Sequence, residues 1–476
     1  MERPNIIVIY TDQQRFDTLG VNGNNLIRTP NLDRLAAEGV SFSRAYTTCP
    51  ICVPSRVSFM TGRYAHTNRS WSNNRQMFES ETDLVSALKA GGYTTALIGK
   101  NHCFPRERMR RTFNVARTAN STRIVDPRAD AQRRVNEIRR PLMQVPMAEN
   151  PISREEDITA YLFRAAREYI AEPKDTPFFL WLSIPDPHPP YTVCEPYASM
   201  YDDVDVPLPA WREGEMDNKP FKQRCIVEWG RYLKEYPTDA DRRRLKAIYW
   251  GMVSYIDDEL GRFMQTLKEH ELDGNTIVVY TTDHGDYMGD HLMVRKGPHV
   301  YEALTHIPQI VRWPGTIRPR ATDAFTENID VMPTLLDLAG VELPDGVQGK
   351  SFRALLAGEA AVHRSMVFAE HGDPGEPLAQ ESLSHDEAER LRNMRTHHLC
   401  PEIRSGCVKG VRTDRWKYCM TPGDVDELYD LENDPNELWN LAADSEYTGI
   451  VREHKDHILD WMIRTQDTKP DGGSGG

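Results

Sequence analysis

The chain has 476 residues, 39% of them hydrophobic, which is enough to bury a large core. Its formal net charge is −13, from 58 basic and 71 acidic residues. Proteins that bind nucleic acid or anionic membranes usually carry net positive charge, so we expect neither kind of partner. The charge does not exclude a small anionic substrate, because a few local cations are enough to bind one. No stretch is long and apolar enough to span a bilayer.

The beginning of the chain lacks a basic and apolar leader, so we expect a cytoplasmic protein, or a periplasmic or secreted one if a leader was removed. The eight cysteines are scattered without a pairing framework, as is usual in a reducing compartment. The terminal sequence GGSGG at 472–476 resembles a linker remnant and takes no part in the predicted fold. The sequence leaves open whether the protein forms a homo-oligomer.

Four short apolar runs predict buried β-strands, at residues 6–10, 94–98, 178–182 and 276–280. Each is rich in β-branched or aromatic residues and almost continuously apolar, as expected of strands buried on both faces. Helical patterns separate the runs. One covers residues 29–39, with Thr29 as a cap and Pro30 in the first turn. A longer helix places its apolar residues on one face, from 245 to 267.

This alternation predicts an α/β fold, with a doubly wound, mostly parallel sheet flanked by helices. Polar residues follow each strand directly, at positions 11–13, 99–102, 185–188 and 281–284. In such sheets, ligands bind beyond the carboxyl ends of the strands. We therefore expect the four polar clusters to form one shared site.

The pattern changes after about residue 362, which we interpret as the end of a catalytic domain over 1–362. Residues 363–471 then form a smaller C-terminal α+β domain. Short strands are expected at 366–369 and 406–411, a hairpin from 416–419 and 427–431, and a final helix over 450–464.

The segment 52–56 (CVPSR), followed by Thr61 and Gly62, resembles the signature of the type I sulfatase family of the alkaline phosphatase superfamily. A cysteine before a helix is by itself more often a buried core residue. In this family, however, the cysteine at the position of Cys52 is oxidised to formylglycine by a maturation enzyme. The resemblance therefore implies a sulfuric ester hydrolase that cleaves sulfate monoesters and depends on that enzyme.

The chemistry of the ester agrees with this resemblance. A thiol is poorly suited to hydrolysing sulfate monoesters, whereas a hydrated aldehyde offers two hydroxyls on one carbon. One hydroxyl attacks sulfur, and the other then loses its proton so that sulfate leaves and the aldehyde returns. A position at a helix N-terminus also supplies backbone N–H groups and a favourable dipole for an anion.

The resemblance further implies one divalent metal, held by Asp12, Gln13, the modified Cys52, Asp283 and His284. The family usually has two adjacent aspartates at the first place, so Gln13 is a departure that removes one negative charge. Its amide oxygen can still bind a cation. An oxygen-rich site suits Ca²⁺ or Mg²⁺, and a histidine ligand favours Mn²⁺. We expect Ca²⁺ by a narrow margin.

Residues 99–102 (GKNH) resemble the family's Gly-Lys-x-His element. By that resemblance, Arg56 and Lys100 hold the nucleophile and the sulfate, and His102 takes the proton during elimination. His188 and Lys296 fall where the family has two further sulfate-binding residues, which neutralise or protonate the leaving oxygen. Converging cations are what charge build-up on an oxyanion requires.

Two alternative functions stay open. A phosphonate monoester or phosphodiester hydrolase of the same superfamily would also match Asp12, Gln13, Asp283 and His284. Such relatives tend to lack the Gly-Lys-x-His element, which favours the sulfatase. A catalytically silent binding protein on the same fold would be expected to have lost charged site residues, and here every matched position is filled. The alcohol that carries the sulfate stays open among aryl, choline, carbohydrate and alkyl groups.

The stretch 106–140 contains eleven arginines, no lysine and four acidic residues. It is interpreted either as a solvated charged insertion or as a lid over an anionic substrate.

Overall fold

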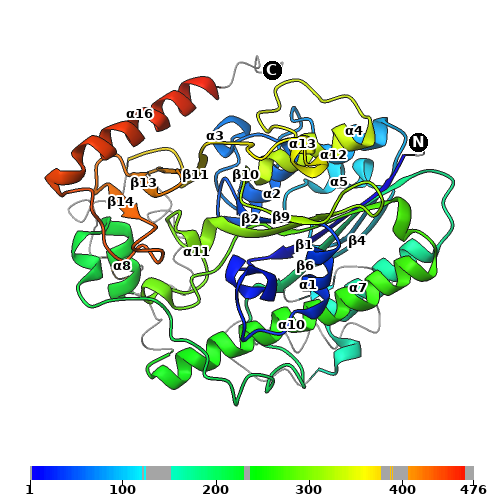
Figure 1. The fold of residues 1–476 in the computed structure, drawn as a ribbon, viewed down its shortest axis with the longest axis horizontal. Helices are drawn as coiled ribbons and strands as arrows, with labels where there is room; N and C mark the ends of the chain where they lie inside the picture. The colour runs from blue at the N-terminus through cyan, green and yellow to red at the C-terminus, as the bar shows by residue number, and fades with distance from the viewer. Residues whose placement is uncertain are drawn as a thin grey trace.

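The computed structural model describes residues 3–120, 123–124, 152–229, 236–376 and 406–466, with the isolated positions 386 and 389. Much of the arginine-rich stretch and all of 472–476 lie outside these residues. A central sheet is covered on both faces by helices, and a second, smaller sheet lies at one side of it (Figure 1).

The central sheet has the strand order β10-β2-β8-β7-β1-β6-β3-β4-β5, with β9 beside β2. The four predicted strands are confirmed, and they are neighbours in its middle. Their bounds are β1 Asn5–Asp12, β3 Thr94–Gly99, β6 Phe178–Pro187 and β7 Thr276–Thr282. β1 pairs in parallel with β6 and β7, and β6 pairs in parallel with β3. The carboxyl ends of these four strands therefore meet at one edge.

Six described strands were not predicted: β2 Val40–Tyr46, β4 Val115–Asn120, β5 Arg123–Ile124, β8 His306–Arg312, β9 Arg320–Thr322 and β10 Thr326–Glu327. They contain polar residues, such as Gln309 in β8, that interrupt the apolar run. β8 runs antiparallel to both β2 and β7. Most of the other pairings are parallel, so the predicted mostly parallel sheet is confirmed.

The two faces of β1 belong to different cores, as its alternation requires. Ile7 and Ile9 pack with the helices α1 Pro30–Ala37, α7 Ile158–Ala171 and α10 Asp239–Glu269. Ile6 and Val8 pack on the opposite side. The helices there are α2 Cys52–Thr61, α4 Leu84–Ala90, α5 Arg106–Thr112, α12 Val331–Ala339 and α13 Arg353–Ala357. Helices on both faces confirm the doubly wound α/β fold.

Helix α1 begins at Pro30 as predicted, but Thr29 does not cap it through its side chain. The Thr29 hydroxyl instead accepts a hydrogen bond from the backbone N–H of Gly20 at 2.9 Å. The free N–H groups of α1 are bonded from another helix. Asp257 of α10 accepts from the N–H groups of Asn31 at 3.1 Å and Leu32 at 2.6 Å. The sequence pattern identified the helix start correctly and its cap incorrectly.

The small sheet consists of β11 Val367–His371, β12 Val408–Arg412, β13 Trp416–Met420 and β14 Glu427–Asp430, antiparallel in that order. The final helix α16, Thr448–Arg464, packs on it through Ile458 and Trp461. The predicted hairpin and C-terminal helix are confirmed. The division of the chain at residue 362 stays a prediction.

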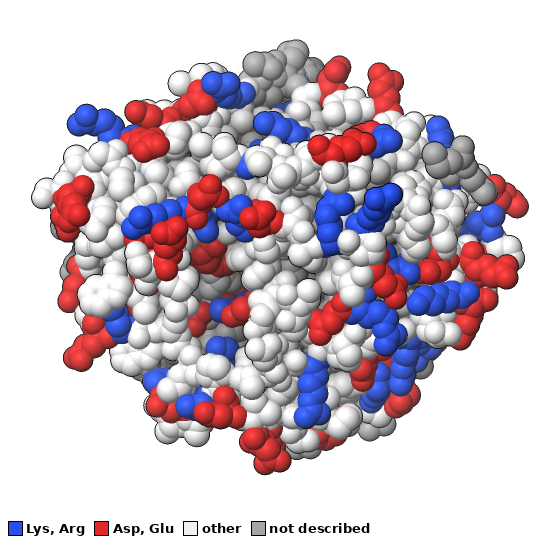
Figure 2. Space-filling view, viewed as in Figure 1, with Lys and Arg blue, Asp and Glu red and all other residues white. Residues whose placement is uncertain are grey.

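Among the described residues, no helix combines the length and the apolar character needed to cross a bilayer. Basic and acidic side chains are interspersed over the face drawn in Figure 2. Side chains of both charges are therefore mixed on this face.

Candidate active site

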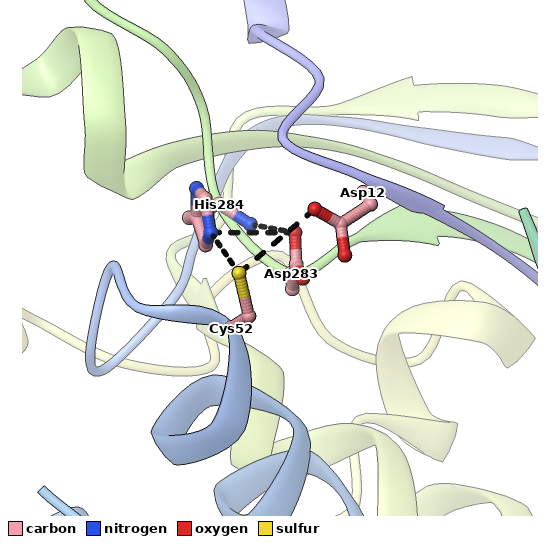
Figure 3. A group of neighbouring side chains, drawn as sticks. All are labelled: Asp12, Cys52, Asp283 and His284. Carbon is pink, nitrogen blue, oxygen red and sulfur yellow. Dashed lines mark hydrogen bonds and ion pairs between the residues drawn. The ribbon is translucent and has the colours of Figure 1, made fainter. Parts of the chain in front are cut away.

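Cys52 is the first residue of α2 and is only 1% exposed. The helix ends at Gly62, which has a left-handed backbone with φ of 63°, so the Thr61-Gly62 pair of the motif is a helix terminus. The Cys52 Sγ lies 3.3 Å from His284 Nε2 and 3.9 Å from Asp12 Oδ1 (Figure 3). The thiol therefore faces the polar residues at the ends of β1 and β7.

Asp12, Cys52, Asp283 and His284 form a buried group in which one potential ligand atom from each residue lies within 4.8 Å of the others (Figure 3). The parallel pairing of β1 with β7 places Asp12 beside Asp283. His284 Nδ1 is 2.8 Å from the carbonyl oxygen of Gly285, which can only accept. Nδ1 therefore carries a proton, and Nε2 faces the group.

Gln13 lies beside this group in a left-handed backbone conformation, with φ of 68°. Two contacts hold it there. Its N–H donates to Asp283 Oδ1 at 2.8 Å, and its carbonyl accepts from the Tyr249 hydroxyl at 2.6 Å. Its side-chain oxygen accepts from Lys296 Nζ at 2.6 Å. Left-handed conformations of this kind persist where surrounding contacts impose them, as they do here.

Arg56 is fully buried and joins the two aspartates. It donates to Asp12 Oδ2 at 2.7 Å and to Asp283 Oδ2 at 3.0 Å. A third bond, of 2.8 Å, runs to the hydroxyl of Ser183, within β6. The ring of Tyr10 lies 5.0 Å from the guanidinium carbon. In this structure, Arg56 thus contacts the carboxylates.

Lys100 reaches the group from the end of β3. Gly99 before it has φ of 112°, and a Cβ there would lie 1.8 Å from the Ser183 carbonyl oxygen, so only glycine fits. This close approach lets the Lys100 N–H donate to the same carbonyl at 2.8 Å. The Lys100 ammonium then donates to Asp12 Oδ2 at 2.5 Å.

His102 and His188 surround the same group. The pKa of His102 is lowered by burial and by Lys100, and Cys52 opposes this shift. The pKa of His188 is lowered well below its usual range by burial and by the charges of Lys296 and Lys100. His188 Nδ1 is 2.7 Å from the Pro189 carbonyl oxygen, so Nδ1 carries the proton. Both imidazoles are therefore neutral near pH 7.

The buried charges act strongly on one another. Burial and the neighbouring Asp12 carboxylate raise the pKa of Asp283 to about 6. Burial also disfavours the charged form of Asp12, but Lys100 and Arg56 outweigh it and hold that pKa well below its usual range. For the Cys52 thiol, burial and Asp12 oppose ionisation. Lys296, Lys100 and His284 outweigh them and lower its pKa. Two buried carboxylates side by side are a suitable place for a cation.

The structure thus brings together all ten residues singled out in the sequence: Asp12, Gln13, Cys52, Arg56, Lys100, His102, His188, Asp283, His284 and Lys296. Three polar contacts of the site were not predicted. Ser183 accepts from Arg56, Tyr249 donates to the Gln13 carbonyl, and Asp286 accepts from the Gln13 side chain. Asp290 and His291 are ion-paired with Arg15 and Glu215, away from this group.

Fold and site together define an α/β enzyme whose buried candidate metal centre, ringed by cations, lies at the strand ends. A family model described as Sulfatase matches residues 4–341. The arylsulfatase of Clostridium perfringens is 30% identical over 99% of this chain and 96% of its own length. The multifunctional alkaline phosphatase superfamily protein PehA of Trinickia caryophylli is 29% identical over 98% of this chain and 96% of its length.

Among solved structures, the phosphonate monoester hydrolase from Silicibacter pomeroyi has a TM-score of 0.82 at 26% identity. The likeness covers 98% of this chain and 96% of that one. The chain belongs to the sulfatase family, within the alkaline phosphatase superfamily. The predicted family and enzyme class are confirmed.

Proposed function

We propose that the protein hydrolyses sulfate monoesters, using a formylglycine made from Cys52 and one divalent metal. The observation that supports this most directly is the set of cations and imidazoles around Cys52. Lys100, His188 and Lys296 approach it from different segments of the chain. Such an arrangement stabilises negative charge as it develops on an oxyanion.

The metal would be held by Asp12, Gln13, Asp283 and His284, together with the modified Cys52. The donors fit a divalent cation, since a cation held by Asp12 and Asp283 would offset the burial and the mutual repulsion that raise the pKa of Asp283 to about 6. When bound, it would polarise the nucleophile's oxygen as a Lewis acid. We propose Ca²⁺, because most donors are oxygens, with Mn²⁺ and Mg²⁺ as the alternatives.

Formylglycine at position 52 would supply, as its hydrate, a hydroxyl nucleophile, and a maturation enzyme would have to make it. The chain's own residues would then do the following work. Arg56 fixes the two carboxylates through its paired N–H groups. Lys100, whose ammonium contacts Asp12, binds the sulfate oxygens. The neutral His102 accepts a proton near position 52.

On the leaving-group side we place Lys296 and His188. The Lys296 side chain can donate to the departing oxygen, and His188 would donate to it from Nε2 once that nitrogen has taken up a proton. The alcohol is proposed to be an aryl or carbohydrate group, since an arylsulfatase is among the relatives.

The test is a comparison of kcat/KM for an aryl sulfate and a matched aryl phosphonate. The protein used should have its formylglycine content measured by mass spectrometry of the peptide that contains Cys52. We expect the larger value for the sulfate, and loss of activity in Cys52→Ala. Full activity with only unmodified thiol would refute the proposal, as would substantial activity in Cys52→Ala.

Metal dependence has its own experiment. Asp283→Ala should lose both bound metal and turnover, whereas the control Asp345→Ala, at an exposed position, should keep both. Bound metal is measured by elemental analysis. Turnover at the native rate by a chelated, metal-free sample would exclude this site.

A second candidate is phosphonate monoester hydrolysis. It is favoured by the likeness to the hydrolase from Silicibacter pomeroyi, with a TM-score of 0.82. A phosphonate preference in the comparison above, with little effect of Lys100→Ala on sulfate turnover, would favour this candidate instead.

A further inference from the structure

Asp286 is a fully buried carboxylate that accepts four hydrogen bonds from four donors. Its Oδ2 accepts from Gln13 Nε2 and, at 2.7 Å, from the Tyr191 hydroxyl. Its Oδ1 accepts at 2.8 Å from each of the backbone N–H groups of Met288 and Arg295. Each of these four contacts is thus with a donor.

Three of these donors belong to separate segments that carry candidate site residues. Gln13 is itself a candidate metal ligand. Tyr191 lies three residues beyond His188, and Arg295 directly precedes Lys296. The Asp286 side chain therefore connects the end of β1 with the loops that carry the two proposed leaving-group residues, His188 and Lys296.

The contact with Gln13 decides which way its amide points. The two ends of a carboxamide have nearly the same shape, so only their hydrogen-bond partners fix the orientation. Because the nitrogen donates to Asp286, the oxygen must point the other way, where it accepts from Lys296 Nζ at 2.6 Å. A cation can be bound by that oxygen and not by the nitrogen.

We propose that Asp286 is a positioning residue that presents the oxygen of Gln13 to the metal and fixes the loop that carries Lys296. This rests on the metal site of the proposed function. Gln13 stands where the family usually has a second aspartate, and its N–H₂ group donates to Asp286 here. An aspartate has no donor to satisfy, whereas glutamine has an N–H₂ group that must find one.

The first test is Asp286→Asn. An asparagine at this position has one acceptor oxygen and cannot serve donors on both sides. The backbone N–H groups of Met288 and Arg295 can only donate, so the oxygen stays with them and the N–H₂ group faces Gln13. The Gln13 amide then turns over to accept from it. We expect the affinity of full-length, chelator-stripped protein for Mn²⁺, measured by EPR of the free ion, to fall at least tenfold. Tyr191→Phe is the matched control. It removes one donor and leaves Gln13 held, so its affinity should change by less than threefold.

A second pair of variants guards against simple misfolding. Gln13→Glu places a carboxylate against Asp286, and we expect it to weaken Mn²⁺ binding. Adding Asp286→Asn restores a donor–acceptor pair of reversed polarity. The double variant should therefore bind Mn²⁺ at least tenfold more tightly than Gln13→Glu alone. A general loss of packing would not be rescued by a second substitution.

Wild-type affinity in Asp286→Asn, or a double variant no better than Gln13→Glu, would overturn the inference. So would the absence of Mn²⁺ binding by the unmutated protein. Metal binding is measured without substrate, so the outcomes are separable. Failure of sulfate turnover with the Asp286 effects intact would overturn the proposed substrate alone.

Discussion

Lys100 is the single side chain on which the proposed sulfate binding most depends. Its ammonium is only 6% exposed and lies against Asp12, in a position that Gly99 makes accessible. We expect Lys100→Ala to reduce kcat/KM for an aryl sulfate by roughly two to three orders of magnitude, the scale for losing one well-placed electrostatic donor. Steady-state kinetics measure this. The exposed Lys350→Ala is the control, and a change below threefold in Lys100→Ala would contradict the assigned role.

Lys222 gives a pH-dependent prediction at the same scale, far from the metal group. Burial lowers the pKa of this lysine to about 8, and its ammonium donates to the Gly406 carbonyl. A folded pKa below the usual 10.5 means that the unfolded chain binds more protons between pH 8 and 10.5. Across that window, Lys222 should therefore make the fold more stable as pH rises.

The experiment compares the unmutated protein with Lys222→Met by urea unfolding at pH 7.5 and pH 10.5. Relative to the variant, the unmutated protein should gain up to about 3 kcal/mol of unfolding free energy over this range. A difference between the two proteins that does not vary with pH would show that the lysine is not perturbed.

The candidate site residues were predictable because each one follows a strand directly or belongs to a spaced motif. Asp12, Lys100 and Asp283 are examples of the first kind. Ser183 and Tyr249 have no such signal. They form hydrogen bonds with site residues that are distant in the sequence, Ser183 with Arg56 and Tyr249 with the carbonyl of Gln13. Partners of this kind follow from tertiary packing, which one sequence does not reveal.

At the scale of elements, helix α1 depends on α10 for its cap. Asp257 is fully buried and accepts from the backbone N–H groups of Asn31 and Leu32 of α1. Asp257→Ala leaves these buried N–H groups unpaired and should lower the unfolding free energy by about 2 kcal/mol. Urea denaturation measures this. Asp239→Ala, at the exposed start of α10, should cost less than about 0.5 kcal/mol. Equal effects of the two substitutions would contradict capping by Asp257.

The long helix was predictable because its apolar residues lie on one face, and the central strands because their burial is nearly complete. Most residues of β1 are buried. The apolar residues predicted for one face of α10 are also all buried: Leu245, Ile248, Met252, Ile256, Leu260, Phe263 and Leu267. Strands β2 and β8 were missed because each lies nearer the edge of the sheet and mixes polar with apolar residues. Their place in the sheet depends on pairing between distant segments, which local periodicity does not report.

At the scale of the whole molecule, the small sheet is joined to the central one by buried polar contacts. Lys417 of β13 pairs with Glu302 at 3.0 Å, and Glu437 accepts a hydrogen bond from the backbone N–H of Glu302 at 2.6 Å. Glu370 of β11 pairs with His66 at 2.9 Å. Separating the two parts would break these contacts and divide a shared apolar cluster, in which Tyr64 and Ile329 pack with Val411.

We therefore expect both parts to unfold in one cooperative transition. Far-UV circular dichroism and tryptophan fluorescence should give the same midpoint, and calorimetry should show one peak. Two resolved transitions would mean that the small sheet is a separate unit, and that its contacts contribute little to holding the parts together.

The position of β1 in the sheet has a consequence for protein synthesis. β1 leaves the ribosome before its partners β6 and β7, which begin at residues 178 and 276. At bacterial and eukaryotic elongation rates, the apolar faces of β1 stay without these neighbours for roughly ten to fifty seconds. During that interval the nascent chain needs protection from aggregation. Under the proposed function, this is also the interval in which a maturation enzyme would reach Cys52, which is only 1% exposed in the finished fold.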